Sequence, residues 1–185
     1  FRHEMYQDYK ANRAAMPDDL IPQIEPIHEV IKALGIKIFV VDGVEADDVI
    51  GTLAAEAEQK GISTIISTGD KDLAQLVTKN IKLVNTMKNE VLDIKGVEKK
   101  FGVKPEQIVD YLALVGDTSD NIPGVEKVGP KTAVNWLTEH NDIDTIIEKA
   151  DEFKGKVGEY LRSGIEQLKL SRKLTEIKKD VKLDF

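Results

Sequence analysis

The stretch IKIFVVDGVEADDVIGTLAAEAEQKGISTIIS, residues 36–67, decides the fold class of this chain. Its opening run, Ile36 to Val41, is β-branched and apolar and predicts a buried strand. The segment from Ala46 to Lys60 predicts a helix, which Gly61 ends. A second β-branched run, Ile62 to Ser67, predicts another buried strand. Strand, helix and strand in this order indicate an α/β fold with a mostly parallel sheet that helices cover.

The chain continues this pattern on both sides. Asp70 to Val77 predicts a short helix, and Ile81 to Val84 predicts a third strand that a hairpin joins to Val91-Leu92. On the N-terminal side, residues 3–13 and Leu20 to Leu34 have helical spacing. Ligands of such sheets bind at the carboxyl ends of the strands, so we expect a functional site there.

Strand signals stop beyond Asp93, and the rest of the chain predicts helices. These helices are expected at residues 94–101, 105–115, 130–139 and 153–178. The sequence therefore divides into an α/β core over residues 1–93 and a helical subdomain over residues 94–185.

Composition and charge narrow the classes of protein that this sequence can encode. The 185 residues are 41% apolar and 32% charged, which is typical of a soluble globular domain and argues against disorder. No apolar run reaches the roughly 18 residues that a membrane helix needs, so no membrane partner is expected. The absence of cysteine excludes disulfides and thiolate metal sites. A net charge of −7 argues against nucleic-acid binding, unless many carboxylates converge on metal ions.

Acidic side chains gather in three short stretches. The first, Val44 to Asp48, follows the first predicted strand, and the second, Thr68 to Asp72, follows the second predicted strand. The third, Gly116 to Asn121, ends a leucine-rich helix. Because two stretches follow consecutive strands, the fold should bring them to one edge of the sheet. The carboxylates concerned are Glu45, Asp47, Asp48, Asp70, Asp72, Asp117 and Asp120.

Each acidic stretch alone has an ordinary explanation, because acidic residues cap helices and favour their first turns. Taken together, like charges held this close would repel and raise one another's pKa values unless cations neutralise them. Hard oxygen ligands without His or Cys favour Mg²⁺ or Mn²⁺. Two such ions, roughly 3.5–4 Å apart, are the usual device for in-line attack on a phosphodiester.

A glycine-rich turn follows the third acidic stretch directly. It spans Asn121 to Ala133, and Pro130 stands at the first position of the next helix. Free backbone N–H groups at such a helix start can bind a phosphate, and Lys131 and Thr132 can add a charge and a hydroxyl. This pattern indicates binding to the DNA backbone without base specificity. An ordinary helix–turn–helix corner is the alternative.

These motifs resemble the flap endonuclease superfamily, and within it the 5′–3′ exonuclease domains of bacterial DNA polymerase I. Three motifs carry the resemblance in the family's order: GVEADDVIGT (residues 43–52), STGDKD (67–72) and LVGDTSDNIPGV (114–125). The resemblance runs along essentially the whole chain. It implies a PIN-like or resolvase-like nuclease core and a helix–hairpin–helix-type motif (H3TH) in the helical subdomain. Residues 1–17 look like part of the family's helical arch.

The resemblance also implies roles for individual residues. The ligands of a first metal ion would be Glu45, Asp47, Asp48 and Asp70, which with Lys10 and Arg13 would form the catalytic group. A second ion would be held by Asp72, Asp117 and Asp120. The 5′ strand in the arch would contact Arg2, Tyr9, Lys10 and Arg13. Duplex backbone would be gripped by Gly124, Val125, Gly129, Lys131 and Thr132, and the same turn would hold a K⁺ ion through its carbonyls.

One departure from the family's pattern matters. Family members carry two further metal-binding aspartates ahead of the arch, one at the end of a first core strand and one in a Phe-Asp pair. Neither aspartate is present in these 185 residues, and that strand is missing with them. We therefore expect a fragment with impaired metal affinity and cleavage, whose parent chain continues into polymerase domains.

The resemblance implies hydrolysis of DNA near the 5′ end of a flap, a nick or a duplex, as in primer and flap removal during replication and repair. The expected protein is a monomer in the bacterial cytoplasm, associated with the nucleoid. Two alternatives stay open. One is a PIN-type ribonuclease, and the other is a catalytically impaired module that binds branched DNA.

Overall fold

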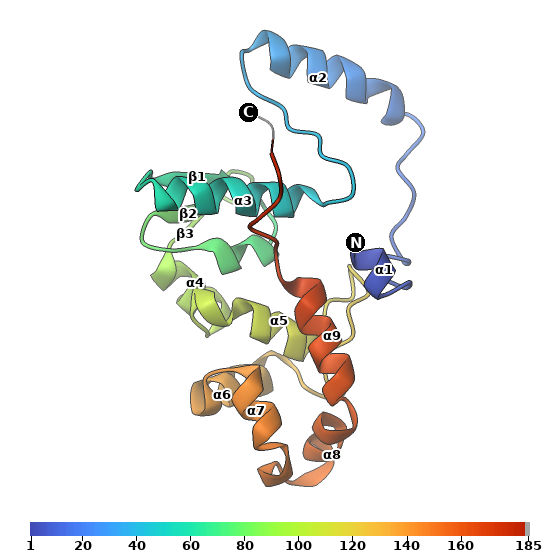
Figure 1. Cartoon of the computed structure of the whole chain (residues 1–185), viewed down its shortest axis with the longest axis vertical. Helices are drawn as coiled ribbons and strands as arrows, with labels where there is room; N and C mark the ends of the chain where they lie inside the picture. Colours follow the sequence, from blue (N-terminus) through green and yellow to red (C-terminus); the bar gives the residue numbers. More distant parts are fainter. Residues whose placement is uncertain (184–185) are drawn as a thin grey trace.

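The computed structural model describes residues 1–183, and a small sheet lies at one side of the molecule (Figure 1). Its strands follow the order β1 (Thr64–Ser67), β2 (Ile81–Asn85) and β3 (Glu90–Leu92). β1 and β2 run parallel, whereas β2 and β3 form an antiparallel hairpin. The second and third predicted strands and the hairpin are therefore confirmed, in a sheet that is mixed.

Helices cover this sheet and contribute to its core. α3 (Ala46–Gln59) precedes β1, and the 3₁₀ helix η2 (Asp72–Leu76) connects β1 to β2. Both pack against the sheet, where Leu73 of η2 and Leu83 of β2 are almost fully buried. The expected α/β architecture is thus present, and the short helix predicted at residues 70–77 takes the form of a 3₁₀ turn.

The second half of the chain is helical, as predicted. α5 and α9 pack against each other, and the chain beyond α9 rises beside α3 (Figure 1). One hydrophobic core extends from the sheet into these helices. None of the helices among residues 1–183 is long and apolar enough to span a membrane. The elements of this half are α4 (Ile94–Phe101), η3 (Pro105–Gln107), α5 (Ile108–Val115), α6 (Pro130–His140), α7 (Ile143–Glu148), η4 (Ala150–Glu152), α8 (Gly155–Ser163) and α9 (Ile165–Thr175).

Two details of the helical half differ from the sequence prediction. The long helix expected at residues 153–178 is two helices, because the chain turns at Gly164 between α8 and α9. α7 was not predicted, since a helix of six residues is too short to show a clear period. Its start is fixed by Asp142, whose carboxylate accepts a hydrogen bond from the N–H of Thr145 at 2.8 Å.

The predicted strand at Ile36–Val41 is wrong. These residues form no strand, and the side chains of Ile36 and Val40 are 57% and 77% exposed. A strand requires backbone partners on a neighbouring strand. Among residues 1–183, β1 pairs with β2 alone, so the other edge of β1 is open, but residues 36–41 do not pair with it and remain irregular.

The predicted helix at residues 3–13 is shorter than expected. α1 spans Arg2–Met5 and ends where Tyr6 becomes extended, with φ −148° and ψ 107°. Lys10 then adopts a left-handed backbone, with φ 58°, and its N–H donates to the carbonyl of Asp120 at 2.9 Å. The segment therefore turns toward the third acidic stretch, where its backbone finds partners outside a helix.

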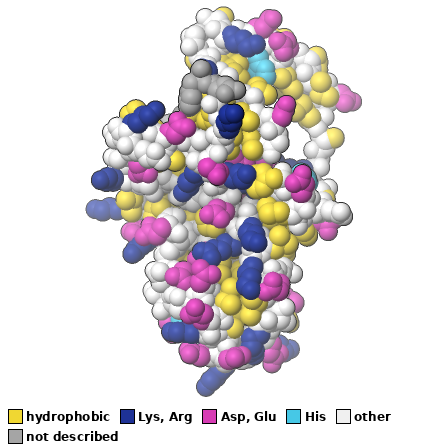
Figure 2. Space-filling model, viewed as in Figure 1, with side chains coloured by type: hydrophobic (Ala, Val, Ile, Leu, Met, Phe, Trp, Pro, Cys, Tyr) yellow, Lys and Arg dark blue, Asp and Glu magenta, His cyan; other side chains and the backbone are white. Residues whose placement is uncertain are grey.

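The predicted helix at Leu20–Leu34 is confirmed as η1 (Ile21–Gln23) followed by α2 (Ile24–Ala33). α2 stands apart from the sheet in Figure 1 and buries none of its residues. Figure 2 shows apolar side chains on α2, and over the rest of this face it shows lysines and arginines interspersed with acidic side chains. This face of the molecule therefore carries no broad basic surface.

Candidate metal and nucleic-acid site

Glu45 and Asp48 stand at the start of α3, and Arg2 closes over them. Glu45 is the N-cap residue, and its N–H donates to Asp48 Oδ2 at 3.0 Å. Arg2 forms a bidentate pair with Asp48, in which both N···O distances are 2.8 Å. Asp48 is fully buried, whereas the Glu45 side chain is 30% exposed. Of the two carboxylates, only Glu45 thus faces solvent.

The ionisation of Asp48 is fixed by these contacts. Burial acts to raise the pKa of Asp48, but hydrogen bonds from Arg2 and from the N–H groups of Lys178 and Glu45 hold that pKa below its usual range. Asp48 is therefore ionised at neutral pH, and its charge is compensated inside the protein.

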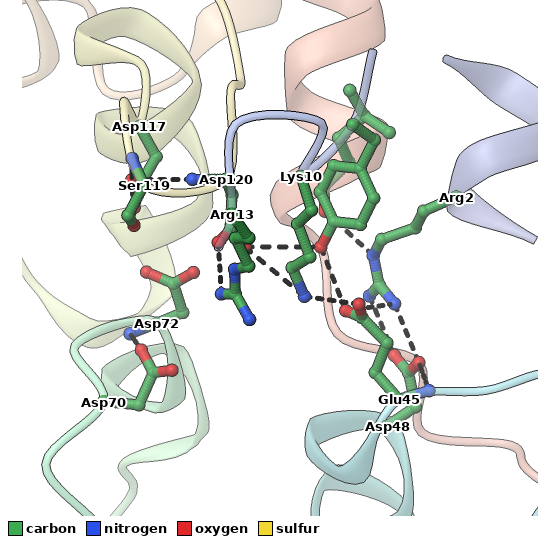
Figure 3. Close-up of polar contacts among 12 residues, drawn as sticks. Arg2, Lys10, Arg13, Glu45, Asp48, Asp70, Asp72, Asp117, Ser119 and Asp120 are labelled. Atoms are coloured by element: carbon green, nitrogen blue, oxygen red, sulfur yellow. Dashed lines mark hydrogen bonds and ion pairs between the residues drawn. The ribbon is translucent and has the colours of Figure 1, made fainter. Parts of the chain in front are cut away.

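Lys10 and Arg13 lie between the acidic stretches (Figure 3). The Lys10 ammonium contacts Glu45 and lies 3.6 Å from Asp120 Oδ2. The Arg13 guanidinium lies 2.5 Å from Asp120 Oδ1. The Tyr9 hydroxyl donates to Glu45 Oε2 at 3.0 Å, and burial together with the Glu45 charge raises the pKa of Tyr9. The N-terminal segment thus bridges the first and third acidic stretches.

Asp117 pairs with Lys71, a residue for which the sequence predicted no role. Their Nζ···Oδ2 distance is 2.6 Å, and the N–H and hydroxyl of Ser119 donate to Asp117 Oδ1 at 2.7 and 2.5 Å. Burial acts to raise the pKa of Asp117, but these contacts hold it below its usual range. The signal for Lys71 was its position between two aspartates, where a cation has carboxylates on both sides.

Asp47, Asp70 and Asp72 have no cationic partner in the described part of the chain. The N–H of Asp72 donates to Asp70 Oδ1 at 2.9 Å, and the buried Asp72 Oδ1 has no hydrogen-bond partner. Burial and the charge of Asp70 raise the pKa of Asp72 to about 7. Burial and the charges of Asp70 and Glu45 also raise the pKa of Asp47. The first and second stretches therefore lie close enough to repel each other, as the sequence predicted.

The donor set suits a hard divalent cation, since it consists of carboxylates. Among residues 1–183, however, no three acidic or histidine side chains form a preformed metal site. Lysine and arginine groups neutralise four of the carboxylates, and Figure 3 shows three of these groups, Arg2, Lys10 and Arg13. The unpaired Asp72 oxygen and the raised pKa values of Asp47 and Asp72 are the features that a bound cation would relieve. The residues thus fit divalent metal ions once Lys10, Arg13 and Lys71 withdraw.

The glycine-rich turn leads into α6 as predicted. Pro130 is the first residue of α6, and Gly129 caps the helix without a side-chain hydrogen bond. Lys131 is exposed, Thr132 is half-buried, and within residues 1–183 their backbone N–H groups donate to no acceptor. The start of α6 therefore offers two free donors beside an ammonium and a hydroxyl.

The other side of the turn faces the protein. The Val125 side chain is buried, and its N–H donates to the Leu114 carbonyl at 2.9 Å. Two side chains of α9 hold the turn: Gln167 donates to the Gly124 carbonyl at 3.1 Å, and the Ser171 hydroxyl donates to the Pro123 carbonyl. The sequence did not identify these two α9 residues, because nothing in their spacing connects them to a turn more than 40 residues away.

Family models match the whole chain. The model described as "5'-3' exonuclease, N-terminal resolvase-like domain" matches residues 1–102, and "5'-3' exonuclease, C-terminal SAM fold" matches residues 103–185. Among curated proteins, DNA polymerase I of Pseudomonas aeruginosa is 49% identical over 100% of this chain and 21% of its own length. A 5'-3' exonuclease of Aquifex aeolicus is 44% identical over 100% of this chain and 63% of its own length. The chain thus spans a fifth to about two thirds of these relatives.

Solved structures show the same fold at lower identity. The T5 5'-exonuclease with bound zinc ions has a TM-score of 0.82 and 24% identity, over 95% of this chain and 69% of that one. The catalytic core of Rad2 in complex with DNA has a TM-score of 0.55 and 17% identity, over 97% of this chain and 62% of that one. From the family models and the curated relatives, this chain belongs to the 5′–3′ exonuclease family of nucleases.

Proposed function

We propose that this domain hydrolyses DNA phosphodiesters from a 5′ end, at a flap, a nick or a 5′-ended duplex, with two Mg²⁺ or Mn²⁺ ions. The observation that carries the proposal is that carboxylates of the three acidic stretches converge on Asp70 and Asp72. Asp117 and Asp120 act on Asp72, whose buried oxygen has no partner, and Asp70 acts on Asp47. Asp47, Asp70 and Asp72 form no ion pair among the described residues and repel one another, and a bound cation would relieve this repulsion. The two alternatives, a PIN-type ribonuclease and a module that binds DNA without cutting it, are distinguished by the experiment described below.

The carboxylates divide between the two ions by their place in the fold. Glu45, Asp47 and Asp70 would hold the first ion, and Asp72, Asp117 and Asp120 would hold the second. When bound, such ions activate water and stabilise the leaving oxygen. Lys10 and Arg13, which lie on Glu45 and Asp120, would turn to the phosphate and offset its charge.

The start of α6 would hold the duplex at a distance from the cleavage site. Its free N–H groups and the side chains of Lys131 and Thr132 suit a phosphate oxygen. The backbone of Gly124, Val125 and Gly129 would shape the turn and offer carbonyls to a K⁺ ion. Residues 94–185 would thus hold the duplex and supply Asp117 and Asp120 to the cleavage site, whose other carboxylates come from residues 1–93.

The names of the curated relatives support a proposal about the biological setting. Proteins named DNA polymerase I contain this region as a fraction of their length, so we propose that it acts in replication and repair beside polymerase domains. We propose further that it acts as a monomer in the bacterial cytoplasm, at the nucleoid.

The decisive experiment compares this chain with a version extended at its N-terminus, on an end-labelled 5′-flap DNA in Mg²⁺. Cleavage by at least the extended version is expected. If both are inert, the nuclease proposal is wrong. Preferential degradation of single-stranded RNA would support the ribonuclease, and flap binding without cleavage in Mn²⁺ would support the binding module.

Substituting Lys10 with methionine should separate metal binding from cleavage. Loss of the ammonium frees Glu45 and Asp120, so Mn²⁺ should bind about threefold to tenfold more tightly in the absence of DNA. Cleavage should nevertheless fall by about 100-fold, because a cation facing the phosphate is lost. Titration calorimetry and single-turnover cleavage measure the two effects. Lys100→Met, which removes a surface pair with Glu90, is the control and should change neither.

Substituting Lys131 with methionine should weaken DNA binding at every sequence alike. Each lost phosphate contact lowers the slope of log K against log salt by about 0.9, so the slope of this variant should fall by about that amount. Lys149→Met removes an exposed lysine at the end of α7 and serves as the matched control. Equal slopes for the two variants would show that α6 does not hold the phosphate.

A further inference from the structure

The guanidinium of Arg2 donates four hydrogen bonds inside the protein and forms an ion pair with Glu45. Its Nε donates to the Leu174 carbonyl at 3.0 Å. One terminal nitrogen donates to Asp48 Oδ2 and lies 3.3 Å from Glu45 Oε2, and the other donates to Asp48 Oδ1 and to the Glu176 carbonyl, each at 2.8 Å. Four of the five N–H groups of this arginine are therefore hydrogen-bonded, and the nitrogen that carries the fifth lies beside the Glu45 carboxylate. Arg2 is also 4% exposed, so a phosphate in solvent cannot reach its guanidinium while these contacts hold.

The carboxylate oxygens of Asp48 have all their acceptor positions occupied. Its Oδ1 accepts from Arg2 and from the N–H of Lys178 at 2.9 Å, and its Oδ2 accepts from Arg2 and from the N–H of Glu45 at 3.0 Å. Two carboxylate oxygens offer about four acceptor positions, and all four are taken. With no exposed surface and no free lone pair, Asp48 has no position left for a metal ion.

The pair joins three segments that are distant in sequence. Arg2 belongs to α1, Asp48 to the first turn of α3, and the three backbone partners to the end of α9 and the chain after it. Figure 3 shows Arg2 reaching across to Asp48 and Glu45 from outside the group of other carboxylates. The pair therefore fixes the helical half and the N-terminal segment to the start of α3, where Glu45 and Asp47 stand.

We propose that Arg2 and Asp48 are positioning residues of the nuclease site, and that neither contacts DNA or metal. This assignment replaces the roles that family resemblance implies for both, and it rests on the proposed function for the site that they position. The buried pair sets the backbone of Glu45 and Asp47, so these two carboxylates face the cations in a fixed geometry. Supporting contacts of this kind change metal affinity by about 10- to 100-fold when they are lost.

The variants Arg2→Met, Arg2→Lys, Asp48→Asn and Arg2→Met/Asp48→Asn test the assignment in the whole chain. Arg13→Met is the matched control, because Arg13 lies in the same segment but is 55% exposed with a single ion-pair partner, Asp120. Three quantities are measured without cleavage: the thermal midpoint, the affinity for Mn²⁺, and the salt dependence of flap-DNA binding.

Arg2→Met should lower the thermal midpoint by about 10 °C, since it strands a buried charge. It should weaken Mn²⁺ binding by about 10- to 100-fold. Its salt slope should equal that of the wild type, whereas the slope of Arg13→Met should fall by about 0.9. The double variant should lose much less stability than the sum of the two single variants, because the residues act as one pair.

Arg2→Lys keeps the protein folded if Arg2→Met does not. A lysine keeps the positive charge but cannot reproduce the bidentate pair, so the variant should resemble Arg2→Met in Mn²⁺ affinity. A salt slope that falls by about 0.9 in Arg2→Met but not in Arg2→Lys would assign Arg2 to DNA and overturn the proposal. So would an Asp48→Asn variant that loses Mn²⁺ binding at an unchanged thermal midpoint. If the wild type binds flap DNA but never cuts it, the nuclease function fails while these comparisons still decide the role of Arg2.

Discussion

Asp70→Asn should lower the rate of DNA cleavage by about two to three orders of magnitude and leave the fold intact. Asp70 is exposed, and within residues 1–183 its only hydrogen bond through a side-chain oxygen is the one that Oδ1 accepts from the N–H of Asp72. An asparagine keeps that oxygen and the turn it stabilises. What it loses is the negative charge that a divalent cation needs.

The same substitution should not reduce stability. The charge of Asp70 raises the pKa values of Asp72 and Asp47, which is the sign of mutual repulsion. Removing it relieves that repulsion, so the thermal midpoint in EDTA should stay the same or rise. Cleavage is measured under single-turnover conditions. The substitution is made in the version of the chain, as given or extended at its N-terminus, that cuts the flap DNA. Glu98→Gln, an exposed charge on α4, is the control. Cleavage within tenfold of the wild type would remove Asp70 from the site.

Gly124→Ala should cost at least about 3 kcal/mol of unfolding free energy. A Cβ on Gly124 would lie 2.5 Å from the carbonyl carbon and oxygen of Val115 and 2.6 Å from the N atom of Gly116. These are backbone atoms at the end of α5, so no side-chain rotation relieves the clash. The turn must move away from α5, and the contacts that place the third acidic stretch beside the start of α6 move with it.

Gly129→Ala is the matched control in the same turn. A Cβ there meets no atom within 4 Å, and the backbone at φ −102° suits any residue. Gly129→Ala should lower the free energy of unfolding by no more than about 1 kcal/mol, the difference between glycine and alanine at an N-cap. Urea unfolding of the two variants gives both values. If Gly124→Ala is as stable as Gly129→Ala, the close approach of the backbone at Gly124 to the end of α5 is not needed for stability.

The sequence by itself predicted much of the fold. Apolar runs and glycine stops located α3, two of the strands, the hairpin and most of the helical half, because these depend on local periodicity. The same reasoning failed at Ile36–Val41, whose composition suits a strand but which pairs with no strand among the described residues. It also failed at residues 7–13, where contacts with Asp120 and Thr118 replace helical hydrogen bonds.

For the site, the sequence determined which residue types are available and in what order along the chain. It identified the acidic stretches, the turn before α6 and the family. Only the tertiary structure decided how the carboxylates differ: Asp48 is sealed by Arg2, Asp117 is paired with Lys71, and Asp72 keeps an oxygen without a partner. The reason is physical. Burial and charge pairing depend on residues that are distant in sequence, so identical aspartates acquire different roles only when the chain has folded around them.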